Sequence, residues 1–274
     1  MNRNVVLKLA EAIKQNKAVV HLTIVDQQGS SPRHNAEMLI DESGTILAGT
    51  IGGGAVEQKA IEDGIKALKK GDSNVVHYKL KMDKNDKEAL QMACGGDVSV
   101  LIRPYLRTRR IVTVGAGHIS LALSKMAELL GYQYVVVDDR PEFASAARFP
   151  NATIVVGDVK VALDQLETYQ SDAFVIVSHD HVHDIDALIA LKDKPHFYLG
   201  MIGSKKKVLY SYEQIKKQGL SLDPAQVHAP IGIDIGGEAP AEIALAIMAE
   251  IQAVWHGKKV KNLKVESGKC KAES

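Results

Sequence analysis

The chain has 274 residues, of which 46% are hydrophobic and 24% charged, and its formal net charge at pH 7 is +1. This composition is typical of a soluble globular protein, and the length suits one large domain or two of ordinary size. A net charge so close to zero provides no field that would recruit nucleic acid or an anionic membrane. We therefore expect neither as a partner.

The N-terminus and the cysteines indicate the compartment. Lys8, Glu11 and Lys14 stand where a signal peptide needs an uninterrupted apolar core. No stretch approaches the ~18–20 apolar residues that span a bilayer. Only Cys94 and Cys270 are present, far apart in the chain, which excludes a disulfide-rich scaffold and a four-cysteine zinc site. These features predict a cytoplasmic protein.

The first 106 residues predict an α+β domain whose glycines are concentrated in loops. Apolar residues at helical spacing predict helices, and β-branched runs bounded by turn residues predict strands. The predicted elements are helices over 5–15 and 55–70, strands over 18–26, 75–81 and 98–105, and a hairpin of 37–40 with 45–48.

Three loops of this domain carry candidate ligand-binding residues. Ser30 and Arg33 lie in a compact turn after a buried strand, and Gly52, Gly53 and Gly54 lead into a helix as a backbone nest for an anion. The glycine loop lacks the Gly-Lys-Ser/Thr ending of a nucleotide-triphosphate loop, which excludes ATP hydrolysis there.

Cys94 stands before two glycines, so its backbone can be approached closely and its thiol can lie exposed in a loop. We count it as a candidate cofactor or metal ligand. A buried structural thiol is the alternative.

From residue 107 the chain alternates strands and helices, which predicts an α/β domain: a Rossmann-type, doubly wound parallel sheet. We expect this domain over 107–262, after a linker at 103–110, and a polar tail over 263–274. The predicted elements are strands over 111–114, 134–137, 153–156, 174–178 and 197–199, a further candidate strand over 228–231, and helices over 119–130 and 240–255.

The turn Gly115-Ala116-Gly117-His118 follows the first of these strands and opens a helix. Gly115 permits a tight turn, Gly117 lets a phosphate approach the backbone, and the helix N-terminus attracts the anion. Ser120 stands where a third small residue packs helix against strand. The pattern predicts a phosphate-binding site.

An acidic residue at the end of the second strand can accept a ribose hydroxyl, and Asp138 holds that position. Arg140 follows it. Two roles remain open for Arg140: contact with a 2′-phosphate, or an ion pair with Asp139.

The segment 178–184, Ser-His-Asp-His-Val-His-Asp, ends the fourth strand, where ligands bind in open α/β sheets. His179 and His181, with His183, alternate in a way that can present imidazoles to a metal, with nearby aspartates as oxygen ligands or orienting groups. The alternative is a polar loop in which Asp184 caps a helix over 185–192.

Ser204 and Lys205 lie at the next strand-to-helix junction, in a glycine- and lysine-rich segment. Such a junction suits a second anionic group. A solvated basic turn is the alternative interpretation.

Taken together in order, these segments resemble the XdhC/CoxI family, the xanthine dehydrogenase accessory proteins, over nearly the whole chain. The resemblance rests on QGSSPR (28–33), TIGGGAVE (50–57), ACGG (93–96), VGAGHIS (114–120), VVDDRPEFA (136–144), SHDHVHD (178–184), GMIGSKKK (200–207) and APIGIDIGGEAPAEIALAI (229–247). One departure is His34-Asn35, where the family's turn has glycine after the arginine.

The resemblance implies a chaperone of the molybdenum cofactor rather than an enzyme. Such a protein binds and protects molybdopterin, supports its sulfuration by a cysteine desulfurase, delivers it to a xanthine dehydrogenase-type molybdenum hydroxylase, and tends to dimerise. The glycine loops would cradle phosphates, and Cys94 would approach the molybdenum or its sulfur. The alternative, an NAD(P)-dependent oxidoreductase, would explain the Rossmann turn but leave the two N-terminal glycine loops unexplained. A metal-dependent hydrolase would rest on 179–184 alone.

Overall fold

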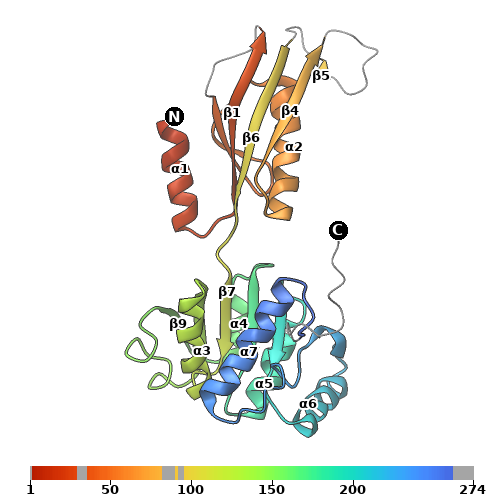
Figure 1. Cartoon of the computed structure of the whole chain (residues 1–274). Coiled ribbons are helices and arrows are strands. Elements are labelled where there is room, and N and C mark those ends of the chain that lie inside the picture. Colours follow the sequence, from red (N-terminus) through yellow and green to blue (C-terminus); the bar gives the residue numbers. More distant parts are fainter. Residues whose placement is uncertain (1, 30–35, 82–89, 92–95, 262–274) are drawn as a thin grey trace, which may run out of the picture. The chain divides into compact units, whose positions relative to one another are not determined.

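The computed structural model describes residues 2–29, 36–81, 90–91 and 96–261. The chain divides into two compact units, residues 1–107 and 108–274 (Figure 1). Among the described residues, no helix combines the length and apolar character that crossing a membrane requires.

The N-terminal unit is built on one sheet with the strand order β3-β2-β1-β6-β4-β5. All neighbouring pairs are antiparallel except β4 and β5, and the longest pairing runs from Val19 opposite Tyr105 to Gly29 opposite Gly96. The elements are α1 (Arg3–Lys14), β1 (Val19–Gly29), β2 (Glu37–Asp41), β3 (Ile46–Gly49), α2 (Gly54–Lys70), β4 (Asn74–Lys81), β5 (Leu90–Gln91) and β6 (Gly96–Tyr105).

Alternating side chains of this sheet pack against helices on opposite faces, as the period of two in a strand requires. Val20 and Leu22 of β1 share a buried cluster with Val56 and Ala60 of α2. Val19, which precedes Val20 and points to the other face, packs with α1 instead. The helices in Figure 1 accordingly cover the two faces of the sheet.

The C-terminal unit is a five-stranded parallel sheet with the order β11-β10-β7-β8-β9. The elements are β7 (Arg110–Val114), α3 (His118–Leu129), β8 (Gln133–Asp138), β9 (Ala152–Val156), α4 (Val159–Gln165), β10 (Asp172–Ile176), α5 (His181–Leu191), β11 (Tyr198–Met201), α6 (Lys205–Lys217), a 3-10 turn at Pro224–Gln226 and α7 (Pro240–Trp255).

Helices cover both faces of this sheet. One buried cluster joins Ile111 of β7 to α3 and α7, and the other joins Val112 to α4, α5 and α6. The connection after β9 returns to the opposite side of β7, so the strand order reverses between β7 and β10. In such doubly wound sheets the ligand crevice lies outside the carboxyl ends of the strands at this reversal. The topology confirms the predicted α/β, Rossmann-type class.

Two local predictions are wrong. Helix α5 begins at His181 and its N-cap is Asp180, whose side chain accepts a 3.2 Å hydrogen bond from the Val182 amide, so Asp184 is not the cap. Residues 228–231 add no strand to the sheet: His228 forms only an isolated parallel bridge with Gly200.

Candidate functional site

The two glycines of the turn after β7 have different structural roles. Gly115 has a φ of +108°, and a Cβ there would lie 2.5 Å from the Val177 carbonyl oxygen, so the turn passes too close to the end of β10 for any side chain. A Cβ on Gly117 would meet nothing within 4 Å, and its backbone is extended. Gly117 therefore leaves open space before α3.

Helix α3 begins directly after this opening. His118 is its exposed first residue, and no side chain of the described residues caps the helix. Because the first N–H groups of a helix have no partner within it, this end suits an anion that approaches over Gly117.

Asp138, at the end of β8, is committed to contacts within the protein. Its Oδ2 accepts a 2.6 Å hydrogen bond from the Ala116 amide, and its Oδ1 accepts from the amide and Nε of Arg140 at 3.0 and 2.9 Å. The side chain is only 2% exposed. Burial opposes ionisation, but the hydrogen bonds from Arg140 and Ala116 outweigh it and lower the pKa of Asp138 to about 2.

Arg140 pairs chiefly with Asp138, a partner that sequence reasoning did not consider. Its guanidinium donates to both oxygens of Asp138 and lies 4.1 Å from the centre of the Phe143 ring. The ion pair with Asp139 that the sequence left open is longer, at 3.9 Å from Nε to Oδ1. Asp138 and Arg140 thus form a clamp on the turn, with no polar atom of Asp138 left for a ribose.

Sequence reasoning missed Arg148, which holds the same turn from its other side. Its Nη1 donates to the carbonyl oxygens of Ala116 and Phe143, both at 2.7 Å. The Ala116 residue is therefore held at its N–H by Asp138 and at its oxygen by Arg148. Nothing in the local sequence marks Arg148, because it lies in an irregular loop between β8 and β9.

Ser120, in the place of a third small residue, is fully buried in a hydroxyl network. Its Oγ lies 3.0 Å from Thr113 Oγ1 and 3.0 Å from the Tyr134 hydroxyl, which also donates to the Ser120 carbonyl at 2.8 Å. The three side chains join α3 to β7 and β8 under the turn.

A buried carboxylate, that of Asp184, links the loop after β10 to helix α6. Ser178 Oγ donates to Asp184 Oδ1 at 2.6 Å, and Lys207 Nζ lies 2.5 Å from Asp184 Oδ2. Asp184 is fully buried, and the Lys207 side chain is 18% exposed. The ion pair supplies the partner that the buried Oδ2 needs.

Among the residues of the basic junction, Lys207 points inward rather than the predicted Lys205, which is exposed. Ser204 caps α6 by accepting a 3.3 Å hydrogen bond from the Lys207 amide. Capping accounts for Ser204, and Lys205 remains available to solvent.

The histidines of segment 178–184 separate into two groups. The rings of His179 and His183 are 5.4 Å apart, and His183 Nε2 lies 3.9 Å from Asp139 Oδ2. One ligand atom from each of these three residues lies within 4.8 Å of the others. His181, which was predicted as a ligand together with His179, lies instead against Tyr210, with ring centres 6.4 Å apart.

The predicted anion nest in the N-terminal unit holds a carboxylate of the chain itself. Gly52, Gly53 and Gly54 have φ values of +113°, +76° and +67°. Within this loop Glu57 Oε2 accepts hydrogen bonds from Thr50 Oγ1 at 2.5 Å and from the amides of Ile51 and Gly53 at 3.2 Å. Other predicted site residues, Ser30, Arg33 and Cys94, lie outside the described residues.

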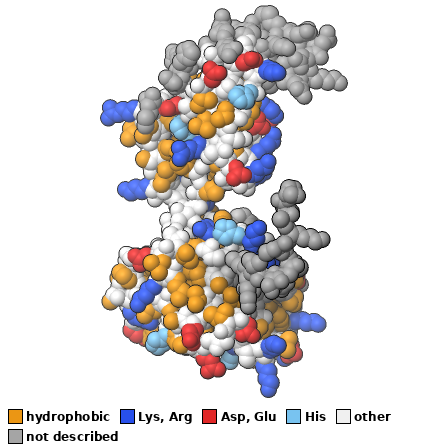
Figure 2. Space-filling view, in the orientation of Figure 1, with side chains coloured by type: hydrophobic (Ala, Val, Ile, Leu, Met, Phe, Trp, Pro, Cys, Tyr) orange, Lys and Arg blue, Asp and Glu red, His pale blue; other side chains and the backbone are white. Residues whose placement is uncertain are grey.

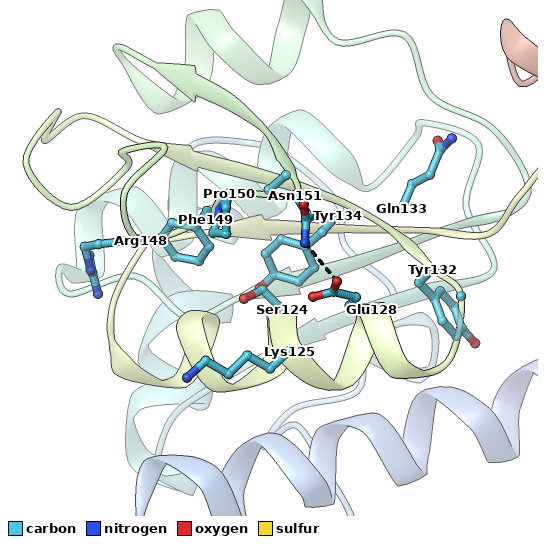
Figure 3. A pocket seen from close by; sticks show the side chains of 12 residues that line it. Ser124, Lys125, Glu128, Tyr132, Gln133, Tyr134, Arg148, Phe149, Pro150 and Asn151 are labelled. Atoms are coloured by element: carbon cyan, nitrogen blue, oxygen red, sulfur yellow. Dashed lines mark hydrogen bonds between the residues drawn. The ribbon is translucent and has the colours of Figure 1, made fainter.

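A pocket of about 340 Å³ lies away from the carboxyl edge (Figure 3). Its lining comes from α3, the first residues of β8 and the segment 148–152, at the amino ends of the strands. Glu128 and Asn151 are joined across it by a 2.8 Å hydrogen bond. Arg148, which donates to the Ala116 carbonyl, also lines this pocket.

The carboxyl edge forms a continuous set of contacts, from Asp138 through Ala116 and Gly115 to Ser178, Asp184 and Lys207. Backbone groups at the start of α3 and the exposed His118 and Lys205 can bind anions there.

Figure 2 also shows hydrophobic side chains on the face where α3 and α7 lie in front. On these helices Leu129 is 87% and Leu245 is 52% exposed.

Family models match both parts of the chain. The model described as the XdhC Rossmann domain matches residues 111–251, and the model described as the XdhC and CoxI family matches residues 12–79. A crystal structure described as a xanthine dehydrogenase from Bacillus halodurans has the same fold: it is 21% identical with a TM-score of 0.51, covering 92% of this chain and 96% of that one.

Three curated relatives are similar in sequence. Uncharacterized protein YqeB of Escherichia coli is 36% identical over 257 residues, which cover 92% of this chain and 46% of that protein. A probable xanthine dehydrogenase component of Bacillus subtilis is 29% identical over 145 residues, covering 52% and 42%. The molybdenum cofactor insertion chaperone PaoD of E. coli is 21% identical over 305 residues, covering 92% and 88%.

This chain spans less than half the length of the first two relatives. The Rossmann-domain match alone covers more than half of the chain, and the second match adds the N-terminal unit. The chain therefore belongs to the XdhC and CoxI family.

Proposed function

We propose that this chain is a chaperone that binds the molybdenum cofactor as cargo at the carboxyl edge of the parallel sheet. The observation that carries the proposal is the family match in both units, together with similarity to PaoD, which is named as a molybdenum cofactor insertion chaperone. The open turn fits this cargo, since molybdopterin carries a phosphate and Gly117 leaves space in front of the uncapped start of α3.

The contacts of Asp138 favour a carrier over an NAD(P)-dependent oxidoreductase. A dinucleotide-binding Rossmann domain uses the acidic residue after the second strand to accept a ribose hydroxyl. In this chain both oxygens of Asp138 already accept hydrogen bonds from Arg140 and Ala116. A nicotinamide dinucleotide would have to open this clamp, whereas a phosphate at Gly117 would not.

The finer steps of the proposal concern sulfuration and delivery. The chain would hold the cofactor while a cysteine desulfurase supplies sulfur, with Cys94 near the molybdenum, and would then pass the cofactor to a xanthine dehydrogenase-type molybdenum hydroxylase. We propose a cytoplasmic homodimer for the carrier, and the exposed leucines of α3 and α7 support such an association.

Mass spectrometry of small molecules released from the purified chain tests the cargo. We expect a phosphorylated pterin, and a nicotinamide dinucleotide in its place would overturn the proposal. Gly117→Val should lower the amount of pterin retained while the protein stays folded, because the extended backbone accepts a β-branched residue. Gly117→Ala is the matched control with a smaller side chain, and it should retain more pterin than the valine variant.

Replacing each of the two cysteines by serine tests the sulfuration and delivery steps. The purified chain is mixed with molybdopterin, a cysteine desulfurase and an apo molybdenum hydroxylase. Cys94→Ser should leave the melting temperature almost unchanged but lower the hydroxylase activity obtained, and Cys270→Ser should change neither. Full activation by a normally folded Cys94→Ser protein would remove Cys94 from cofactor handling.

A further inference from the structure

Asp139, His179 and His183 stand together at the carboxyl edge, although they come from segments that follow the strands on either side of β7, with His183 in the first turn of α5. Asp139 follows β8, and the two histidines follow β10. Their ligand atoms lie within 4.8 Å of one another. We infer that these three residues form a binding site for a divalent transition metal ion, with Zn²⁺ as the reference ion.

The donor set selects the class of metal. Imidazole nitrogens suit Zn²⁺, Ni²⁺, Cu²⁺ and Fe²⁺, whereas Mg²⁺ and Ca²⁺ prefer sites made of oxygens. Two imidazoles and one carboxylate are also the set that leaves a coordination position for water or another ligand. Asp139 and His179 are exposed, so a metal ion held by these residues would be accessible from solvent.

The site needs only small side-chain movements. Metal–ligand bonds of about 2.0–2.2 Å place tetrahedral ligand atoms roughly 3.4 Å apart. The separation between His183 Nε2 and Asp139 Oδ2 is 3.9 Å. Arg140 Nε lies 3.9 Å from the other oxygen of Asp139, Oδ1, so Oδ2 can turn to a metal while Oδ1 keeps its cationic neighbour.

Each ligand is adjacent in sequence to a residue whose side chain is held by hydrogen bonds or an ion pair. Asp139 follows Asp138, which Arg140 and the Ala116 amide hold. His183 precedes Asp184, which is paired with Lys207, and His179 follows Ser178, which donates to Asp184. The backbones that carry the ligands are thereby positioned before a metal arrives, which is what a precise site requires.

Zn²⁺ titration of the full-length chain tests the inference, without molybdenum cofactor and near pH 7.5, where imidazoles are mostly neutral. Cys94→Ser/Cys270→Ser is the background, so that thiolates do not compete for zinc. We expect one equivalent of Zn²⁺ and no comparable binding of Mg²⁺. His179→Ala, His183→Ala and Asp139→Asn should each weaken zinc binding by more than the ~10–100-fold that loss of an outer-sphere partner costs.

His181→Ala is the matched control, since His181 lies in the same segment but against Tyr210. It should leave zinc affinity within about twofold of the background protein, which is below 0.5 kcal/mol. Replacing Zn²⁺ by Co²⁺ gives an independent readout, because its visible spectrum should change in the His183→Ala protein and not in the His181→Ala protein. His179 is exposed, so the His179→Ala variant keeps the test valid if His183→Ala fails to fold.

Two results would overturn the site: no stoichiometric Zn²⁺ in the background protein, or unchanged zinc affinity in a folded His179→Ala/His183→Ala double variant. The cofactor assays measure a different ligand. Failure of the metal site therefore leaves the proposed carrier function intact, and failure of the carrier function leaves the metal site intact.

Discussion

The carboxylate of Asp138 accepts a 2.6 Å hydrogen bond from the backbone amide of Ala116. This bond joins the end of β8 to the glycine turn after β7, two segments that a bound dinucleotide would otherwise bridge. Because Arg140 neutralises the same carboxylate, the turn keeps its shape without any ligand. The Rossmann crevice of this chain is stabilised by its own acidic residue.

Asp138→Asn should destabilise the protein in a pH-dependent way. The folded pKa of about 2 lies below the usual value of 3.8, so ionised Asp138 stabilises the fold above about pH 4, and this contribution disappears as the pH falls towards 2. The shift corresponds to about 2 kcal/mol. Denaturant unfolding of both proteins from pH 7 to pH 2 should show their stability difference shrinking over that interval.

Asp139→Asn, in metal-free buffer, is the control for this experiment. Asp139 is exposed and makes no close ion pair, so the substitution should change the unfolding free energy by less than about 0.5 kcal/mol. A stability difference between wild type and Asp138→Asn that does not vary with pH would contradict the clamp.

Lys207→Met should cost about 3–5 kcal/mol, since it leaves the fully buried Asp184 carboxylate without its cation. Thermal unfolding measures this loss. Lys205→Met removes an exposed lysine from the same helix and should lie within about 0.5 kcal/mol of wild type. Combining Lys207→Met with Asp184→Leu should recover part of the lost stability, because it also removes the buried charge. A double variant less stable than Lys207→Met alone would argue against an uncompensated charge as the cause.

Gly115→Ala should destabilise the C-terminal unit by at least about 2–3 kcal/mol. The new methyl group would overlap the Val177 carbonyl, and φ would stay at +108°, where side chains are strained. Gly117→Ala is the internal comparison: its Cβ meets open space, so its stability should be unchanged or up to about 1 kcal/mol higher. Equal losses in the two variants, measured by thermal unfolding, would contradict the different roles assigned to these glycines.

Glu57→Ala should destabilise the N-terminal unit by about 1–3 kcal/mol, because the Thr50 hydroxyl and two amides lose their shared acceptor. It should also free the glycine nest, so that inorganic phosphate raises the melting temperature of the variant more than that of wild type. Gln58→Ala, at the exposed next position, should show neither effect. The same phosphate response in wild type and Glu57→Ala would mean that the nest takes no external anion.

Local sequence patterns predicted much of this structure. The bounds of α7 agree with the prediction from Pro240 to Trp255, because proline and the apolar period fix both the start and the face of the helix. The parallel sheet followed from strand–helix alternation, and the glycine turn from its position between β7 and α3.

The charge partners could not be predicted in the same way, since they depend on which distant residue fills a buried position. Asp180 and Asp184 are both acceptable helix caps by local rules. Lys207, which lies well beyond Asp184 in the chain, accounts for Asp184 being drawn inward. In the same manner His183 lies beside Asp139 across β7, whereas the spacing of histidines along the chain gave no reason to prefer it to His181.

The hydroxyl network beneath the turn has a consequence for how relatives of this chain can differ. Ser120 is fully buried with its Oγ between Thr113 and the Tyr134 hydroxyl. If alanine stood at position 120, the Tyr134 hydroxyl would keep the carbonyl of that residue and the Thr113 hydroxyl would keep the Val135 carbonyl, but both would lose the Ser120 hydroxyl as a partner. Since a buried hydroxyl that loses a hydrogen-bond partner costs stability, we expect these three positions to be exchanged together, with alanine at 120 accompanied by phenylalanine at 134 and valine at 113.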